Sequence, residues 1–398
     1  MPAAFDTRAS HDQRFSAWLT NPDTLTTARP SGNSITAGIP WVHVDFDGHV
    51  TGPTEVTTSS RYATTNSGYT LDQRRQVLEA LDSAYAPFNV RFTTDPNPFP
   101  GAGPYAGRLL VGATMTRNGL GLSGVPGIAL SNSFRSTTSN PIAAVQWNTN
   151  PRNAAISSLT VSTVGFFAAH EIGHTLDLRH KGLLASSTQA AEEYYDGHAT
   201  AAGNRWFPLM GKAPVGVNVF PQWSKGDYFR NGRGASNTVD EVAALTARLG
   251  ARPDDFADSI TSTLPTRSVG DGRFVSGTIG TRTDVDIFRI QWNGGPLSLR
   301  VDPAGAVASS PQSQIAYGAT DDVSGLNLQM DILRSDGTVA FTSSPTNSKG
   351  AAFTDLNLSA GTYFVRVDGV GEGSFAGPNS TGFDDYGSLG GYMLSGLM

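Results

Sequence analysis

Three histidines and one glutamate lie within a single stretch of eleven residues, and this stretch constrains the fold more than any other feature of the chain. Residues 170–180 read His-Glu-Ile-Gly-His-Thr-Leu-Asp-Leu-Arg-His and follow a mainly apolar run at residues 161–169. Because residues four apart share one face of a helix, His170 and His174 can direct two ring nitrogens at one point. His180 can join them only if the helix ends and the chain turns back.

This set of side chains is suited to a metal ion. Imidazole nitrogens are common zinc ligands, and a catalytic zinc site has three protein ligands and one open position. Glu171, directly after the first histidine, is placed to act as the general base on a zinc-activated water molecule. The residues therefore predict a zinc hydrolase, with peptide bonds as the logical substrate and other amides or esters open to the same chemistry.

The helix that carries these residues is expected to span residues 158–178 and to be buried. Its apolar residues cover most of its circumference, as in helices of a protein interior. Histidines and a carboxylate in such a helix are costly unless they have a partner or a purpose. A pair of core histidines that bond to their neighbours is the competing interpretation.

The composition favours strands, turns and loops over a helical bundle. The chain includes 45 glycines and 23 prolines. Its length of 398 residues predicts two or three domains. The absence of cysteine excludes disulfides and thiolate zinc ligands. The net charge of -6 comes without a basic patch, so nucleic acid is not an expected partner. No apolar run reaches the roughly 20 residues that span a bilayer, and no signal peptide is visible.

Residues 38–250 are expected to form an α+β domain after an N-terminal extension at residues 1–37. A first helix begins with a capping box at Thr70 and Gln73 and ends at Pro87. The predicted strands of this domain are residues 40–48, 89–93, 108–113, 128–130 and 143–147.

The helix with the histidines is followed by a long aromatic-rich loop at residues 181–237. Loops of this length inside a domain are usually functional. A third helix is expected to begin after Asn237 or Thr238, either of which can cap it, and to end at Gly250.

Residues 251–398 change in character and predict an all-β sandwich. Short alternating segments recur there between Gly, Pro, Asp and Asn, without a helical pattern. The predicted strands are residues 274–278, 285–292, 297–301, 326–333, 339–342, 351–358, 362–367 and 391–396.

The stretch from His170 to His180 resembles the long zinc-binding signature of the metzincin clan of metallopeptidases, His-Glu-x-x-His-x-x-Gly-x-x-His. The resemblance implies a mixed twisted sheet with three main helices at residues 38–250. It also implies a methionine turn below the zinc, for which Met210 in Pro208-Leu209-Met210-Gly211 is the candidate. In such a peptidase the three histidines hold zinc and Glu171 is the catalytic base.

Asp177 departs from this signature, which has glycine at that position. The glycine lets the helix end and turn sharply towards the third ligand. Aspartate is among the few other residues that tolerate a left-handed conformation, so Asp177 is expected to make the same turn. In the alternative arrangement, Asp177 itself is the third ligand and His180 is not.

A subset of the clan has a tyrosine two residues after the methionine, where this chain has Lys212. That role is therefore not transferred to this position. The candidates for contacting the substrate or the transition state are Tyr194, Tyr195 and Tyr228. His198 is interpreted as a loop residue, with a second metal site as the alternative.

The C-terminal region resembles the bacterial pre-peptidase C-terminal type of domain, which is a β-sandwich with a jelly-roll-like form. The matching residues are Gly277–Gly280, Asp284–Arg289, Ala360–Gly369 and Tyr386–Tyr392. The resemblance implies a protein secreted by a bacterium, and a module that either is removed or binds a substrate or a cell surface.

Clustered carboxylates in this region are candidate ligands for calcium, which prefers oxygen ligands. The alternative interpretation is a set of solvated aspartates in turns. The candidates are Asp284, Asp286, Asp384 and Asp385.

Together these features predict a secreted zinc-dependent endopeptidase that acts on a protein or peptide, with calcium as a second candidate ion. Two alternatives remain: a non-catalytic adhesin or binding protein with structural zinc, and a zinc hydrolase of a non-peptide amide. Glu171 favours catalysis, because a structural zinc site has no use for a general base.

Overall fold

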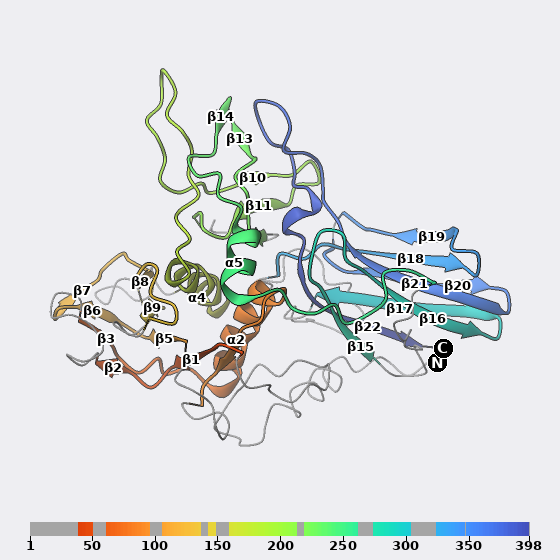
Figure 1. Ribbon diagram of the computed structural model, residues 1–398, viewed down its shortest axis with the longest axis horizontal. Helices are drawn as coiled ribbons and strands as arrows, with labels where there is room; N and C mark the ends of the chain where they lie inside the picture. Colours follow the sequence, from red (N-terminus) through yellow and green to blue (C-terminus); the bar gives the residue numbers. More distant parts are fainter. Residues whose placement is uncertain are drawn as a thin grey trace.

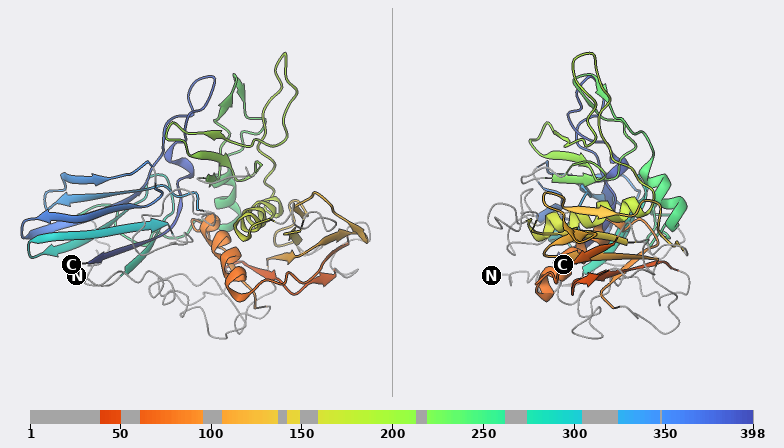
Figure 2. Two further views of the ribbon diagram at one scale, coloured as in Figure 1. Left: turned by 180° about the vertical axis from the view of Figure 1, so that it is seen from behind. Right: turned by 90° about the vertical axis from the view of Figure 1, so that its left-hand side faces the viewer.

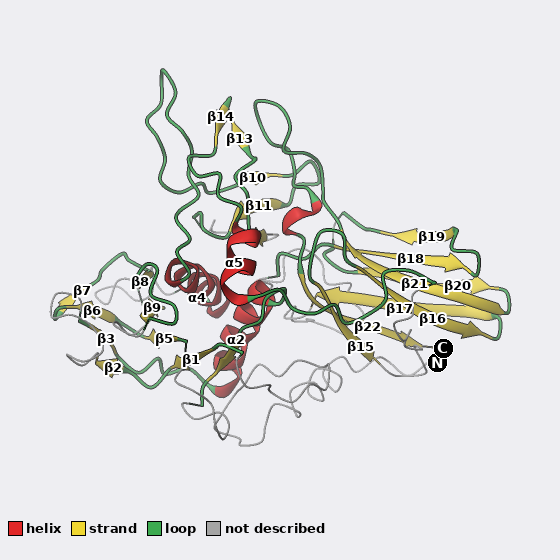
Figure 3. Cartoon of the chain, in the orientation of Figure 1, coloured by secondary structure: helices red, strands yellow, loops and turns green. Residues whose placement is uncertain are grey.

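The computed structural model describes residues 39–50, 61–95, 106–136, 142–148, 159–212, 219–261, 274–303, 324–346 and 348–397. The chain forms an N-terminal part with three described helices and a strand-rich C-terminal part (Figures 1 and 3). The expected extension at residues 1–37 lies outside the described residues. Within the described part, no helix is long and apolar enough to cross a membrane.

A five-stranded sheet in the order β4-β1-β5-β9-β8 forms the centre of the N-terminal part. Strands β4, β1, β5 and β9 run parallel, and β8 pairs antiparallel with β9 at one edge. The bounds are β1 Trp41–Asp45, β4 Arg91–Thr93, β5 Gly107–Gly112, β8 Gly127–Ala129 and β9 Ile142–Gln146. These strands confirm the five that the sequence predicts in this region.

A smaller antiparallel sheet in the order β2-β3-β6-β7 lies in the same part of the chain. Its strands are β2 His49–Val50, β3 Tyr62–Thr64, β6 Met115–Arg117 and β7 Leu120–Gly121.

Helix α2 (Leu71–Tyr85) begins with the predicted capping box. The Thr70 hydroxyl accepts from the Gln73 amide (3.3 Å), and the Gln73 side chain accepts from the Thr70 amide (2.9 Å). Helix α4 (Val161–Thr175) is capped by Thr160 and is shorter than expected at both ends, since the prediction extended from residue 158 to residue 178. Asp177 is left-handed (φ 69°) and cannot continue a right-handed helix.

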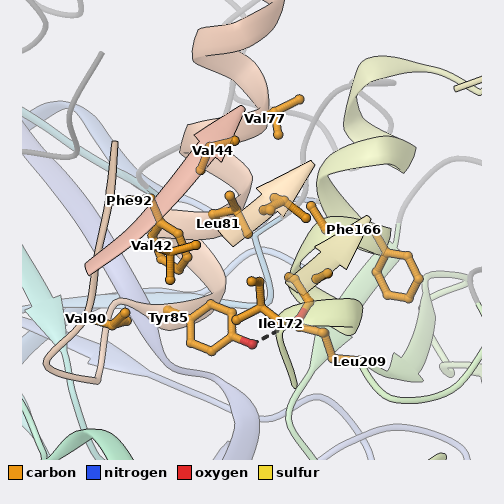
Figure 4. Close-up of a cluster of buried hydrophobic side chains, with 14 of the residues drawn as sticks. Val42, Val44, Val77, Leu81, Tyr85, Val90, Phe92, Phe166, Ile172 and Leu209 are labelled. Atoms are coloured by element: carbon orange, nitrogen blue, oxygen red, sulfur yellow. Dashed lines mark hydrogen bonds between the residues drawn. The ribbon is translucent and has the colours of Figure 1, made fainter. Parts of the chain in front are cut away.

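Helices α2 and α4 lie side by side and share one hydrophobic core with the sheet (Figures 2 and 4). The Tyr85 hydroxyl reaches across from α2 and donates to the Ala169 carbonyl (2.9 Å) on α4, as Figure 4 shows. Gly165 permits close approach, because a Cβ there would lie 2.5 Å from the Cβ of Ala80. This packing fixes the helix that carries the histidines.

The segment after α4 is less irregular than the predicted loop. It contains the three-stranded sheet β10-β11-β12 and the hairpin β13-β14. Their bounds are β10 His198–Ala199, β11 Arg205–Pro208, β12 Val219–Gln222, β13 Phe229–Arg230 and β14 Arg233–Gly234.

Helix α5 (Glu241–Leu249) starts later than expected. Its N-cap is Asp240, whose carboxylate accepts from the Ala243 amide (2.8 Å), so the predicted caps Asn237 and Thr238 are wrong. The predicted end is confirmed, because Gly250 is the C-cap with a φ of 81°.

The C-terminal part consists of two four-stranded antiparallel sheets, β15-β22-β17-β20 and β16-β21-β18-β19. Apolar side chains of both sheets share one core, as in a β-sandwich. All eight predicted strands are present, with ends shifted by one to two residues in most cases. The bounds are β15 Phe274–Ile279, β16 Val285–Trp292, β17 Gly295–Pro303, β18 Leu328–Arg334, β19 Val339–Ser343, β20 Ala351–Leu358, β21 Gly361–Gly369 and β22 Gly390–Leu397.

Replacing Gly165 with alanine tests the packing of α2 against α4. Overpacking of this kind costs about 1–3 kcal/mol, which outweighs the gain of about 1 kcal/mol that alanine brings to a helix interior. We expect Gly165→Ala to lower the free energy of unfolding in urea titrations, and the added change Ala80→Gly to restore part of it. A single variant as stable as the parent would contradict this packing.

Candidate metal centre

The end of α4 turns the chain back through a Schellman motif. The Leu178 amide donates to the Gly173 carbonyl (3.0 Å), and the Asp177 amide donates to the His174 carbonyl (3.0 Å). Asp177 occupies the left-handed position that the motif requires, where the metzincin signature has glycine. The turn expected at Asp177 is therefore present.

The carboxylate of Asp177 pairs with an arginine and not with the histidines. Its Oδ2 atom lies 2.9 Å from the Arg248 guanidinium of α5. This ion pair occupies the carboxylate, and it argues against Asp177 as the third metal ligand.

The three histidines of the stretch converge. One potential ligand atom from each of His170, His174 and His180 lies within 4.8 Å of the others. The Nε2 atoms of His174 and His180 are 2.9 Å apart. The described residues thus include a three-histidine cluster that could hold a metal ion.

Each histidine of the cluster is oriented by a hydrogen bond at its other ring nitrogen. The Nδ1 atom of His170 contacts the Leu209 carbonyl (2.9 Å), and that of His174 contacts the Leu178 carbonyl (2.8 Å). Carbonyl oxygens only accept, so both Nδ1 atoms donate and the Nε2 lone pairs are left for a ligand.

The Nδ1 atom of His180 lies 2.7 Å from a Glu193 carboxylate oxygen. A carboxylate that accepts from a ligating imidazole fixes its tautomer and raises its basicity. Sequence reasoning missed Glu193, because its separation from His180 carries no recognised spacing.

The surroundings of the cluster keep two of its histidines neutral. Burial, aided by the neighbouring histidines, lowers the pKa of His170 to about 3. Burial and the charge of His180 outweigh the Leu178 hydrogen bond and lower the pKa of His174 to about 4. Neutral imidazole is the form that binds a metal.

Glu171 is buried next to the first histidine, with 5% of its surface exposed. Burial raises the pKa of its carboxyl group to about 8. On edge strand β8, a Cβ at Gly127 would lie 2.5 Å from the Glu171 Oε1 atom. A glycine is therefore needed beside this carboxylate. In the sequence, the only sign of this requirement is that Gly127 lies in a glycine-rich stretch.

Met210 is fully buried and packs against helix α4. Its sulfur would be 2.7 Å from a Cβ on Gly173, so the thioether packs directly on the backbone of α4. The Met210 carbonyl accepts from the Lys181 amide (2.8 Å), and the preceding carbonyl of Leu209 holds His170. The segment thus contacts the chain at both ends of the histidine stretch.

The three candidate tyrosines have different positions. Tyr194 is 40% exposed, and its ring centroid lies 4.1 Å from that of His180. Tyr195 and Tyr228 are fully buried and stack on each other with centroids 4.4 Å apart. Of the three, Tyr194 is the one in contact with the cluster.

The hydroxyl groups of the two buried tyrosines are engaged in the protein interior. Tyr228 donates to the Gly182 carbonyl (2.9 Å), and Tyr195 bonds to the Nδ1 atom of His198 (2.9 Å). The other nitrogen of His198 donates to the Gly382 carbonyl (2.8 Å). His198 is the first residue of strand β10, so its interpretation as a loop residue is wrong, and its ring contacts the C-terminal part.

A pocket of about 530 Å³ adjoins the third histidine. Its lining includes Arg179, His180, Glu193 and Val239. Val239 is half exposed and Arg179 is also exposed, so the pocket offers both apolar and charged surface. It provides space for a bound molecule beside the cluster.

A second group of possible metal ligands lies in the C-terminal part and comprises Asp254, Asp284 and Asp286. Burial, with neighbouring carboxylates, raises the pKa of Asp284 to about 7 and that of Asp286 to about 9. One oxygen of each is buried without a hydrogen-bond partner.

The other two candidate calcium ligands do not join this group. Asp384 lies 3.5 Å from the Lys225 ammonium, and Asp385 pairs with Arg282. The sequence analysis grouped these two with Asp284 and Asp286, but the third member of the group is Asp254, which sequence reasoning missed. An isolated bridge between Ala257 and Ile287 holds the segment after Asp254 beside strand β16.

Comparisons with known proteins give a weak structural similarity. No family model matches the chain, and no curated protein matches it. Among solved structures, it is similar to the pre-peptidase C-terminal domain of a collagenase from Bacillus anthracis, with 12% identity and a TM-score of 0.22. The match covers 36% of this chain and 97% of that chain. This score carries no argument about activity, so the metzincin resemblance depends on the sequence alone.

The pKa of Glu171 predicts a pH dependence in metal-free protein. It rises from 4.5 to about 8 on folding, so the folded state keeps a proton that the unfolded state releases across this range. The stability contributed by this carboxyl is complete below pH 4.5 and is lost as the pH rises through 8. In chelator-treated protein, we expect Glu171→Gln to gain stability over the parent from about pH 5 to pH 8. Parallel stability profiles in denaturant titrations would rule out this role for burial.

Proposed function

We propose that this protein is a zinc-dependent endopeptidase of the metzincin type. The observation that carries the proposal is the convergence of three imidazoles, each oriented through Nδ1, beside the buried carboxylate of Glu171. Secretion from a bacterium, and binding of a substrate or a surface by the C-terminal part, belong to the same proposal through the sequence resemblances.

The donor set fits zinc. Three neutral imidazoles with one position left open are the ligand set of a catalytic zinc site. The Nε2 atoms of His174 and His180 are 2.9 Å apart, and these two rings together with His170 would hold the ion.

When bound, zinc supplies the Lewis acidity that activates water and polarises the scissile carbonyl. Burial favours the protonated form of Glu171, and a cation held by the three histidines would lower its pKa towards the carboxylate. The Glu171 carboxylate then accepts a proton from the attacking water and returns it to the leaving amine. Neither step forms a covalent bond between the enzyme and its substrate.

Tyr194 and the residues that line the pocket beside His180 are the ones best placed to contact a substrate. The tyrosine ring contacts that of His180, and the residue is partly exposed. Arg179 and Val239 line the pocket next to His180. These residues support a role in holding a peptide next to the metal.

The two alternatives differ from this proposal in specific ways. A structural zinc site, as in a non-catalytic adhesin, is closed by a fourth protein ligand. In the part of the chain that the structure describes, the group around His180 has three. A hydrolase of non-peptide amides would use the same residues, so only the substrate separates it from a peptidase.

Replacing Glu171 with glutamine tests the mechanism. The variant keeps the three histidines, so we expect it to retain one zinc per chain and to lose at least about 100-fold in cleavage of casein or gelatin. Zinc content is measured by elemental analysis. Glu372→Gln, which alters a carboxylate bonded to Asn204, serves as the control and is expected to keep full activity. Comparable cleavage by Glu171→Gln and the parent would refute the mechanism.

We propose, as a second function, that Asp254, Asp284 and Asp286 bind calcium. Unpaired buried oxygens on Asp284 and Asp286 favour an ion, since burying two carboxylates without a cation is costly. The positive charge of Arg252 favours the ionised form of the neighbouring Asp255. Its guanidinium donates a hydrogen bond to the Thr278 hydroxyl.

Calcium is expected to stabilise the protein through these carboxylates. At pH 8 we expect millimolar calcium to raise the thermal midpoint and a chelator to reverse the change. Asp286→Asn should lose most of this response, whereas Asp384→Asn should retain it. A calcium response of the same size in Asp286→Asn would place the ion elsewhere.

A further inference from the structure

Loops of the C-terminal part pack closely on the segment that follows the metal cluster. Glycines permit this contact, because a Cβ at Gly325 would lie 2.3 Å from the Pro221 carbonyl, and one at Gly387 would lie 2.8 Å from Gln222. Gln222 also donates to the Gly325 carbonyl (2.6 Å). The two parts therefore share a tight polar interface and do not meet through a linker alone.

Tyr386 connects this interface to the start of α5 through hydrogen bonds. It lies in the short 3-10 helix η1 (Asp385–Gly387), which is dark blue beside α5 in Figure 1. Its hydroxyl donates to the Asp240 carboxylate (2.5 Å) and accepts from the Val242 amide (3.1 Å). Lys225 lies over its ring, 4.8 Å from the centroid. The C-terminal part thus supports the N-cap of α5.

The same end of α5 holds the chain next to His180. Asn237 donates through its side chain to the carbonyls of Arg179 and His180 (both 3.1 Å). The Lys181 ammonium donates to the carbonyls of Asn237 (3.1 Å) and Val239 (2.7 Å).

Lys181 and Glu241 connect these two sets of contacts. The Lys181 ammonium is fully buried and lies 3.9 Å from the Glu241 carboxylate, which accepts from the Ser224 amide (2.8 Å). A buried ammonium needs partners in fixed positions, because its desolvation is otherwise uncompensated. The position of residues 237–241 therefore determines where Lys181, and the ligand before it, can lie.

We propose that Tyr386 is a positioning residue for the third metal ligand, so that the C-terminal sandwich is a structural component of the metal centre. The path runs from the Tyr386 hydroxyl to Asp240, through the start of α5 to Lys181, and from there to His180. This inference depends on the proposed zinc site. It also implies that removal of the C-terminal part weakens metal binding and does not release an intact peptidase.

The test compares full-length Tyr386→Phe with the parent and with Tyr363→Phe. Tyr363 donates to the Ser359 carbonyl within the C-terminal part and serves as the matched control. We expect Tyr386→Phe to release zinc to a chromogenic chelator about 3- to 10-fold faster than the parent. This ratio of rates corresponds to the free energy of one lost hydrogen bond. The visible spectrum of its cobalt form should also change, since that spectrum reports ligand geometry. Tyr363→Phe should match the parent in both measurements.

Two outcomes separate the inference from the proposed function. If the parent retains zinc and Tyr386→Phe releases it as slowly, the inference is overturned and the zinc site stands. If the parent retains no zinc, both fail. Lys225→Met, which loosens the same segment without removing the hydroxyl, provides the same comparison if Tyr386→Phe does not fold.

Discussion

The metal centre depends on one reversal of the backbone at Asp177. A straight helix can align His170 and His174. If that helix continued, however, it would carry His180, six residues after His174, away from the other two histidines. The left-handed conformation of Asp177 ends α4 and lets His180 return to the Nε2 atoms of the first two histidines. Aspartate is more strained there than glycine, and the ion pair of its carboxylate with Arg248 offsets part of that strain.

Local patterns were sufficient to predict much of the fold. The capping box at Thr70 and the eight strands of the C-terminal part follow from short-range rules, and the structure has them. The cap of α5 was misplaced because Asn237, Thr238 and Asp240 are all good caps, and the choice depends on tertiary contacts. Asn237 instead holds the carbonyls beside the third histidine.

The site was predictable where its residues are close in sequence and not where they are distant. The spacing of the three histidines indicated the cluster, whereas Glu193 and Gly127 came close to it only through folding. Tyr195 and Tyr228 were predicted from their loop, yet they are buried, because aromatic residues in long loops also form cores of their own. Asp254 was missed for a similar reason, since it joins Asp286 across the start of the sandwich.

The most direct test of the central claim is anomalous diffraction at the zinc edge from crystals of zinc-loaded protein. We predict one zinc bound by the Nε2 atoms of His170, His174 and His180 at about 2.0–2.1 Å, with its fourth position free of protein atoms. A fourth protein ligand would identify a structural site. Coordination by Asp177 in place of His180 would contradict the backbone reversal on which the account depends.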